Sequence, residues 1–343
     1  MANAISTSLS GYHQHEVEKY FLSPLFLGED YLSKFTLYPA VKGSMKLDHF
    51  AAAEKITIAQ SGAAFSATAG AAYTQKTLTV GNVEAEFEQY ASTFVGTVKA
   101  EALRLGTDRE NIDGTVVKQI VAEMMMQAVK RDFNRQLWFG DADMSGDNAA
   151  NWDVYNGIFD NLGATLASGQ KLTVGVAADT PSAGCTLAAS GVVTGAECIS
   201  LLEAVYDAAT AELKELPKTL FVSGVIADAY MKYLRSQGVS ESFAYLQDGT
   251  PVLSWNGIPM VVRRDWDSII ANDFAYVAGA SAADSTPRIA LIADKAMAIG
   301  TDFESASVEN WYSQDNKSYR FRLGYKVGVA LMDAKLAVTA IHA

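Results

Sequence analysis

The chain ends with the segment YRFRLGYKVGVAL, residues 319–331, in which large apolar side chains alternate with charged or small ones. Alternation of this kind predicts a long β-strand with one face on the core and the other face in solvent. The Asp333-Ala334 pair after it is expected to turn the chain. Leu336 and Val338 then return as a partner strand, so the C-terminal part of the fold is predicted to be a long hairpin.

Upstream of this strand, helical and strand-like patterns alternate along the chain. Thr194 and Glu197 match a capping box, which predicts a helix over residues 194–215. Ser223 is expected to cap a second helix over residues 225–235. Four strand-sized apolar runs accompany the two helices: residues 219–222, 258–263, 274–277 and 289–292. This alternation predicts a compact mixed α/β unit.

The most regular helical pattern covers residues 113–139, where apolar side chains recur every three or four positions. The apolar stripe consists of Val116, Val117, Ile120, Val121, Met124, Met125, Ala128, Val129, Phe133 and Leu137. Asp113 or Thr115 can cap the start of the helix, and Gly140 follows its end. At 1.5 Å per residue, such a helix is a rod of roughly 35–40 Å.

The N-terminal part has weaker patterns. Residues 1–50 are aromatic without an amphipathic face, so we expect an extended arm that docks on a protein surface, with one short helix near residues 16–22. Residues 55–59 and 76–80 are strand-like, and the stretch 61–73 between them consists mainly of small residues. A long hairpin of this composition has little core of its own, and two strands alone are marginal in water. We therefore expect it to lie on a neighbouring molecule.

Two further segments border these elements. Beyond a predicted turn at Gly81 and Asn82, apolar residues at 83, 85 and 87 alternate with Glu84, Glu86 and Glu88, which predicts a strand with one acidic face. Residues 163–193 are rich in glycine, alanine, serine and threonine, and they are expected to form an exposed excursion.

Composition excludes several classes of protein. Apolar residues make up 49% of the 343 residues, which excludes a disordered chain. The 27 basic and 39 acidic residues give a formal charge of −12, which argues against a nucleic-acid groove. Two cysteines do not make a disulfide framework. The N-terminus lacks a secretory pattern, and no run approaches the roughly 18 apolar residues of a membrane helix.

One loop resembles the beginning of a calcium-binding loop. The segment that runs from Asp141 through Asp143 to Asp147 fits such a loop at positions one, three, five and six, but Trp152 stands where the closing glutamate belongs. These three aspartates are weak candidate metal ligands, and a solvated acidic turn is the alternative. His13 and His15 form a pair without an identifiable third ligand.

Motifs of catalysis and of cofactor binding do not occur in the sequence, so no catalytic residue and no cofactor are predicted. Arg263 and Arg264, like Arg320 and Arg322, form local basic pairs. They are interpreted as donors of salt bridges between subunits or as solvated side chains.

The order of the pieces resembles one known family. It runs from an arm through a β-excursion, a long helix and an α/β unit to a closing strand, as in the major capsid protein of tailed bacteriophages, the Hong Kong 97-like fold. LWFGD at 137–141 followed by NGIF at 156–159 resembles a passage common in these proteins. LFVSGVIADAYMKYL at 220–234 resembles the strand and helix of their axial domain, and NGIPMVV at 256–262 the strand that follows.

The resemblance implies an α+β fold with a specific layout: an N-arm (1–50), an E-loop (51–95), a peripheral P domain (96–193) with its spine helix (113–139), an axial A domain (194–287) and the closing strands of the P domain (288–343). It implies a structural subunit, not an enzyme, that assembles into hexamers and pentamers of an icosahedral virion around double-stranded DNA. Contacts between subunits are then expected at Lys76, Glu84, Glu86, Glu88, Arg263 and Arg264.

The same resemblance implies the partners and the location. The partners are further copies of the chain, a portal, scaffold or decoration proteins and DNA bound without sequence specificity, with no membrane. Assembly takes place in the host cytoplasm. An encapsulin-type shell, which shares the fold, and an uncharacterised enzyme are the alternatives. Residues 1–50 show no cleavable scaffolding segment, and Lys76 has no identifiable partner for a covalent cross-link.

Overall fold

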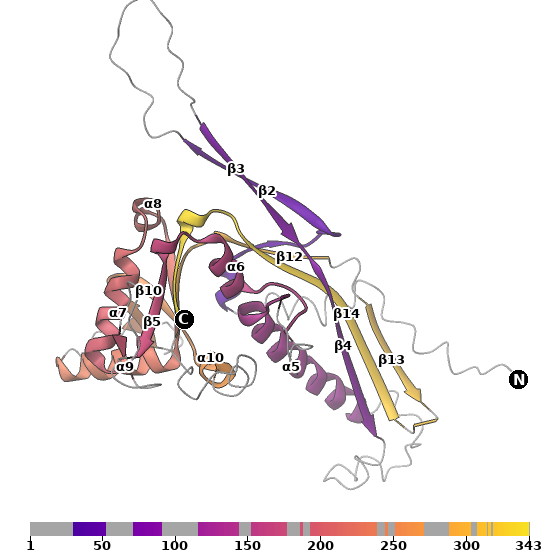
Figure 1. Ribbon diagram of the computed structural model, residues 1–343. Coiled ribbons are helices and arrows are strands. Elements are labelled where there is room, and N and C mark those ends of the chain that lie inside the picture. The colour runs from indigo at the N-terminus through magenta and orange to yellow at the C-terminus, as the bar shows by residue number, and fades with distance from the viewer. Residues whose placement is uncertain are drawn as a thin grey trace, which may run out of the picture.

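The computed structural model describes residues 30–52, 71–90, 116–143, 152–176, 186–187, 193–238, 244–245, 251–270, 288–302, 307–313, 315–316 and 318–342. They form a mixed α+β structure with two main sheets and a projecting hairpin (Figure 1). The short helix predicted near 16–22 and the strands predicted at 55–59 and 274–277 lie outside the described residues. Among the described residues, no helix is long and apolar enough to cross a membrane.

The larger sheet has eight strands in the order β6-β5-β15-β11-β7-β10-β9-β8. The strands are β5 (Lys171–Val176), β6 (Thr186–Leu187), β7 (Lys218–Ser223), β8 (Ala244–Tyr245), β9 (Pro251–Trp255), β10 (Ile258–Arg263), β11 (Ile289–Ala293) and β15 (Ala337–His342). The predicted strands at 219–222, 258–263 and 289–292 are confirmed. The sheet also takes strands from both sides of the predicted unit 194–287, so it crosses both expected borders.

Helices pack on this sheet from both sides (Figure 1). They are α6 (Ile158–Thr165), α7 (Gly195–Asp207), α8 (Ala211–Glu215), α9 (Gly224–Ser236) and α10 (Arg264–Ile269). The capping box is confirmed, because the Thr194 hydroxyl accepts from the Glu197 amide and the Glu197 carboxylate accepts from the Thr194 amide. The single helix predicted over 194–215 is two helices, since Thr210 adopts an extended conformation and caps α8.

α9 begins where it was predicted, but the predicted capping hydrogen bond is absent. Ser223 occupies the N-cap position, but its side chain makes no capping hydrogen bond. The carboxylate of Asp267, on α10, accepts hydrogen bonds from the amides of Gly224 and Val225 instead. A neighbouring helix therefore supplies the cap, which a local sequence pattern does not reveal.

The smaller sheet is built around β14 (Ser318–Leu331), the long strand that the C-terminal alternation predicts. β4 (Gly81–Tyr90) pairs antiparallel with one edge of β14. β12 (Met297–Thr301) and β13 (Ser307–Ser313) pair antiparallel with the other edge, and β1 (Thr36–Tyr38) lies parallel to β12. Side chains that alternate along β14 are buried from Phe321 to Val329.

Two predicted turns are wrong. Residues 336–338 do not fold back on β14, because β15 enters the larger sheet between β5 and β11. Its residues Ala337, Val338 and Ala340 are all buried, as is typical of a central strand covered on both faces. Gly81 and Asn82 do not reverse the chain either: β3 (Ala71–Thr79) leads directly into β4, and the two strands pair with different partners.

The long helix is confirmed as α5 (Val116–Phe139). Val129, Phe133 and Leu137 of its predicted stripe are buried in the main core. Gly140 ends the helix, and its carbonyl accepts from the Gly157 amide at 2.7 Å. A Cβ atom on Gly157 would lie 2.8 Å from the carbonyl oxygen of Gln136 and collide with it. Close backbone packing between two chain segments thus explains why glycine stands at both positions of the Gly-Asp and Gly-Ile passage.

The first part of the predicted exposed excursion, 163–193, differs from the prediction. Residues 163–165 end α6, and β5 lies in the larger sheet. Leu166, Gln170 and Leu172 are buried. α6 itself covers the region where β14 of one sheet approaches β15 of the other. The small residues around these buried positions did not indicate that this segment joins the core.

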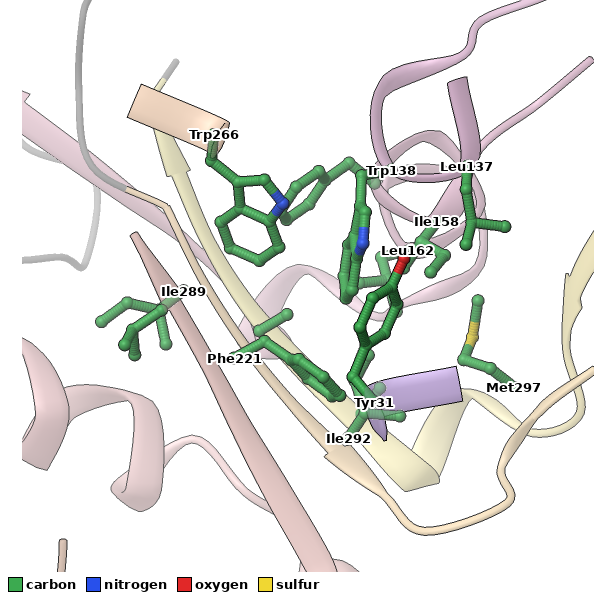
Figure 2. Packing of buried hydrophobic residues seen from close by; sticks show 14 of the residues in the cluster. Tyr31, Leu137, Trp138, Ile158, Leu162, Phe221, Trp266, Ile289, Ile292 and Met297 are labelled. Atoms are coloured by element: carbon green, nitrogen blue, oxygen red, sulfur yellow. The ribbon is translucent and has the colours of Figure 1, made fainter. Parts of the chain in front are cut away.

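Aromatic side chains from distant parts of the sequence meet in the main core (Figure 2). The ring centroids of Trp138, at the end of α5, lie 4.6 Å from Trp266 on α10 and 5.1 Å from Phe221 on β7. Tyr31 and Phe35, at a 3-10 turn spanning Asp30–Lys34, add rings 6.1 and 6.0 Å from Trp138. The predicted docking of the aromatic arm is therefore confirmed for these two residues, and its surface is the chain's own core.

We predict that Phe35→Ala lowers the free energy of unfolding by about 3–5 kcal/mol, since it leaves a cavity beside Trp138 and Phe221. Urea denaturation followed by tryptophan fluorescence measures the change. Tyr90→Ala is the control, because Tyr90 is 55% exposed and its removal should alter stability little. Equal stabilities of the two variants would show that the arm does not stabilise the core.

Candidate functional site: the projecting hairpin and its seat

A two-stranded hairpin projects from the body of the subunit (Figure 1). β2 (Ser44–Ala52) pairs antiparallel with β3 from Ser44 opposite Thr79 to Ala52 opposite Ala71. The predicted excursion thus begins earlier in sequence than residue 51, and β4, which was assigned to it, belongs to the smaller sheet. Its strands form a sheet of their own with two members, so the hairpin has no core beyond its base.

Apolar side chains hold only the base of the hairpin. Leu47 and Leu78 are buried there, with Val41 from the preceding segment. They pack on Ala298 of β12 and Ala330 of β14 as a small cluster separate from the main core. The apolar contact therefore fixes where the hairpin leaves the body and leaves its outer part uncovered.

We call the surface of the smaller sheet beneath this cluster the seat. Two glycines shape it: Gly300 of β12 and Gly328 of β14, which pair with each other across the sheet. A Cβ atom on Gly300 would lie 2.9 Å from Cδ2 of Leu78. One on Gly328 would lie 2.8 Å from the carbonyl carbon of Thr79, which is backbone and cannot rotate away. The seat needs glycine because the hairpin approaches the sheet closer than any side chain allows.

Polar contacts tie the hairpin to the body around the seat. The Lys326 ammonium donates to the Lys42 carbonyl at 3.0 Å, and the Val41 amide donates to the Thr301 carbonyl at 3.0 Å. Farther along β2, Nδ1 of His49 lies 3.0 Å from a carboxylate oxygen of Asp333. These contacts come from β14, from β12 and from the segment that leads into β15.

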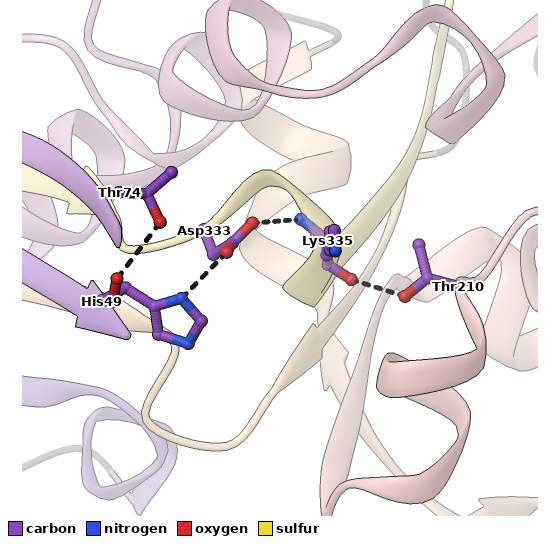
Figure 3. Close-up of polar contacts among 5 residues, drawn as sticks. All are labelled: His49, Thr74, Thr210, Asp333 and Lys335. Atoms are coloured by element: carbon purple, nitrogen blue, oxygen red, sulfur yellow. Dashed lines mark hydrogen bonds and ion pairs between the residues drawn. The ribbon is translucent and has the colours of Figure 1, made fainter. Parts of the chain in front are cut away.

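Asp333 joins the hairpin to the larger sheet (Figure 3). Its second carboxylate oxygen accepts from the Lys335 amide at 2.9 Å and so caps the short 3-10 turn Ala334–Leu336. The Lys335 carbonyl accepts from the Thr210 hydroxyl at 2.8 Å, at the start of α8. No sequence pattern indicates His49 as part of a site, and the pattern at Asp333 predicts only a turn.

Beyond the base, residues 73–77 of β3 are exposed. Tyr73 and Gln75 both donate to Asp48, at 2.6 and 2.8 Å, on one face. The hydrogen bond from Tyr73 is the main reason why the pKa of Asp48 lies below its usual value. Lys76 is exposed opposite Leu47, as expected for a residue that contacts another molecule. Its predicted role between subunits stays a prediction.

The three glutamates predicted between subunits form ion pairs within the subunit. Arg320 lies 3.0 Å from Glu88, and Arg322 contacts Glu84 and lies 3.5 Å from Glu86. A hydrogen bond from Ser318, followed by one from Arg320, lowers the pKa of Glu88. Exposed pairs of this kind contribute little to stability, because solvent screens their charges. These ion pairs link β4 to β14. Contacts of the glutamates with other subunits stay a prediction.

Arg263 and Arg264 lie in different environments. Arg263 is 7% exposed, its guanidinium lies 4.2 Å from the centre of the Tyr31 ring, and it pairs with Asp265 at 2.5 Å. The arm thus supplies an aromatic partner for Arg263 within the chain, and its predicted role between subunits stays a prediction. Arg264 is exposed and lies 2.8 Å from Asp228, whose pKa it lowers. Its contact with another subunit stays a prediction.

The candidate metal loop is only partly described. Asp147 lies outside the described residues, which hold no group of three His, Cys, Asp or Glu side chains arranged around a metal ion. Asp141 accepts from the Asp143 amide at 2.9 Å, so the first aspartate closes the turn itself. Burial and the nearby carboxylates of Asp141 and Asp143 raise the pKa of Asp160 in the first turn of α6. The observed part of the loop is an acidic turn.

Solved structures with the same arrangement come from phage particles. No family model and no curated protein sequence matches this chain. A chain of the satellite phage P4 procapsid, whose structure includes the size determination (Sid) protein, superposes with a TM-score of 0.54 at 10% identity over 94% of this chain and 98% of its own. The chain has the Hong Kong 97-like fold. The expected fold class is thereby confirmed.

Two further structures agree with this fold. A chain from Gordonia phage Cozz gives a TM-score of 0.54 at 12% identity, over 90% of this chain and 85% of its own. A chain from the capsid of an empty GTA particle gives 0.51 at 15% identity, over 91% and 88%. The Hong Kong 97-like fold therefore covers both sheets and the long helix, although few residues are identical.

We predict that Gly328→Ala lowers the free energy of unfolding by about 1–3 kcal/mol, because the new methyl group must displace the backbone at Thr79. Gly324→Ala on the same strand is the matched control, since its methyl group meets only the flexible Ser307 hydroxyl, at 3.1 Å. Thermal unfolding of both variants measures the difference. A Gly328→Ala variant as stable as Gly324→Ala would show that the seat does not hold the hairpin closely.

We predict that Asp160→Asn stabilises the protein at pH 7 and has no effect at pH 3. The raised pKa means that the folded state binds the Asp160 proton more tightly than the unfolded state, so ionisation costs stability as the pH rises above about 4. Urea denaturation at several pH values measures this, with the exposed Asp153→Asn as control. A benefit that is equal at both pH values would exclude ionisation as its cause.

Proposed function

We propose that this protein is the structural subunit of an icosahedral phage capsid, whose copies form hexamers and pentamers that enclose a double-stranded DNA genome. The observation that carries the proposal is the hairpin: it is firmly seated at its base and uncovered beyond it. In an isolated monomer the projecting hairpin stays in solvent, whereas in a shell neighbouring copies cover it. The fold shared with chains from phage capsids supports the same conclusion.

Each part of the chain has its own role in the proposed shell. The hairpin is the E-loop and lies over the spine-helix region, around α5, of a neighbouring subunit, where Lys76 meets that neighbour. The helices and loops around residues 194–287 form the A domain at the axis of each capsomer. β14 with its partner strands and α5 form the P domain at the perimeter, where Arg264 and the acidic edge of β4 contact adjacent copies.

The proposed partners follow from this role. They are further copies of the chain, a portal, scaffold or decoration proteins and the packaged DNA. The formal charge of −12 suits a shell that encloses DNA without binding it tightly, since affinity for phosphates comes from lysine and arginine clusters. The protein would act without catalysis in the virion after assembly in the host cytoplasm.

The test replaces residues 53–70 by Asn-Gly. Ala52 and Ala71 are the last paired residues of the hairpin, and Asn-Gly is the preferred two-residue turn between antiparallel strands. We expect a folded protein with unchanged thermal unfolding that no longer forms closed shells. Negative-stain electron microscopy of the variant and of the unaltered protein measures assembly.

Each outcome decides a different point. Closed shells from the shortened variant would exclude the hairpin as an assembly element. Small uniform particles from the unaltered protein, under all assembly conditions, would contradict the capsid proposal itself. Shells that contain protein cargo in place of DNA would favour the encapsulin-type alternative.

A further inference from the structure

An open groove lies between side chains of α7, α9 and the turn that joins β9 to β10. α7 and α9 lie on the side of the larger sheet away from α5 and α6 (Figure 1). Its volume is about 600 Å³. The side chains that line it are mainly aromatic or acidic: Ile199, Glu203, Tyr206, Asp207, Tyr230, Tyr233, Leu234, Trp255 and Asn256. The functional proposal above makes no use of this groove.

One stripe of α7 supplies the acidic wall. Positions 199, 203, 206 and 207 recur at helical spacing, so their side chains share one face. Glu203 and Asp207 are both exposed on it. The opposite face of α7 packs into the core through Leu201 and Val205. The two carboxylates therefore border the groove because the apolar positions fix the rotation of the helix.

α9 contributes aromatic side chains to the groove, whereas its lysine and arginine side chains lie on the opposite face of the helix. Tyr230 and Tyr233 line the groove, three positions apart. Lys232 and Arg235 fall on the opposite face of the helix, where they and Arg264 lower the pKa of Asp228. The charged groups that line the groove are thus two carboxylates without a lining cation.

Trp255 also lines the groove. Asn256 and Gly257 have φ angles of +49° and +76°, which define a tight turn between β9 and β10. This turn holds Trp255 with its ring centroid 5.8 Å from that of Tyr206, in an edge-to-face arrangement. The ammonium of Lys214 already lies 5.1 Å from the Tyr206 ring centre, so the rings at this site accept a cation.

We propose that this groove binds an arginine side chain presented by a peptide segment of a partner protein. A guanidinium stacks on aromatic faces and pairs with carboxylates, and the groove offers both. Charge complementarity decides the occupant: the two carboxylates disfavour nucleic acid and acidic peptides. A volume of this size accommodates several residues around the arginine. This inference goes beyond the capsid proposal, since the groove lies away from the hairpin and its seat.

The experiment titrates N-acetyl-arginine amide into the full chain and observes the indole N–H signals by NMR, with Trp255→Phe to assign the signal of Trp255. N-acetyl-citrulline amide, which has the same shape without the charge, is the control ligand. We expect a saturable shift of the Trp255 signal with arginine only. The double variant Glu203→Gln with Asp207→Asn should weaken binding about fivefold or more, whereas Glu215→Gln on α8, outside the groove, should not.

Three results would overturn the proposal. The first is an absent or unsaturable shift, and the second is an equal shift with citrulline. The third is a shift that depends on the protein's own concentration and disappears in the double variant, which would identify a second copy as the occupant. The readout is the Trp255 signal of the unassembled chain, so these results test the groove and not the assembly of shells.

Discussion

The packing of aromatic rings around Trp138 is the constraint on which the rest of the structure depends. Trp138 ends the long helix, Phe221 lies in the centre of the larger sheet, Trp266 sits on α10, and Tyr31 and Phe35 come from the arm. Each ring buries a large apolar area, and the edge-to-face contacts fix their relative orientation. The cluster therefore sets the angle at which the helix, the sheet and the arm meet.

The sequence was informative where a pattern is local. The alternation along β14, the helical pattern of α5 and the capping box of α7 each depend on neighbouring residues, and each predicted its element correctly. Pairing partners were missed because they are not local: β15 joins the larger sheet, and β3 and β4 pair with different strands. The order of the pieces still indicated the fold.

The candidate site was predictable only in outline. The sequence predicts a hairpin in this part of the chain, and its contact with a neighbour stays a prediction, but no pattern predicts its seat. Gly300 and Gly328 lie in strands where glycine is unfavourable, and this is the one sequence feature that could have indicated a close approach of backbone. His49 and Asp333 carry no such feature, since their contact joins residues far apart in the chain.

The distance along the sequence between paired strands has a consequence for how the chain is made. β14 and β15 are interior strands of their sheets, and the arm strand β1 pairs with β12, which lies more than 250 positions later (Thr36 opposite Ala298). Neither sheet closes before β14 and β15 have left the ribosome, and folds dominated by such distant contacts form slowly. A nascent chain that has not reached β14 lacks the strand that forms the seat, so nothing holds its hairpin in place. Chains truncated before β14 would therefore lack the projecting hairpin in its seated form.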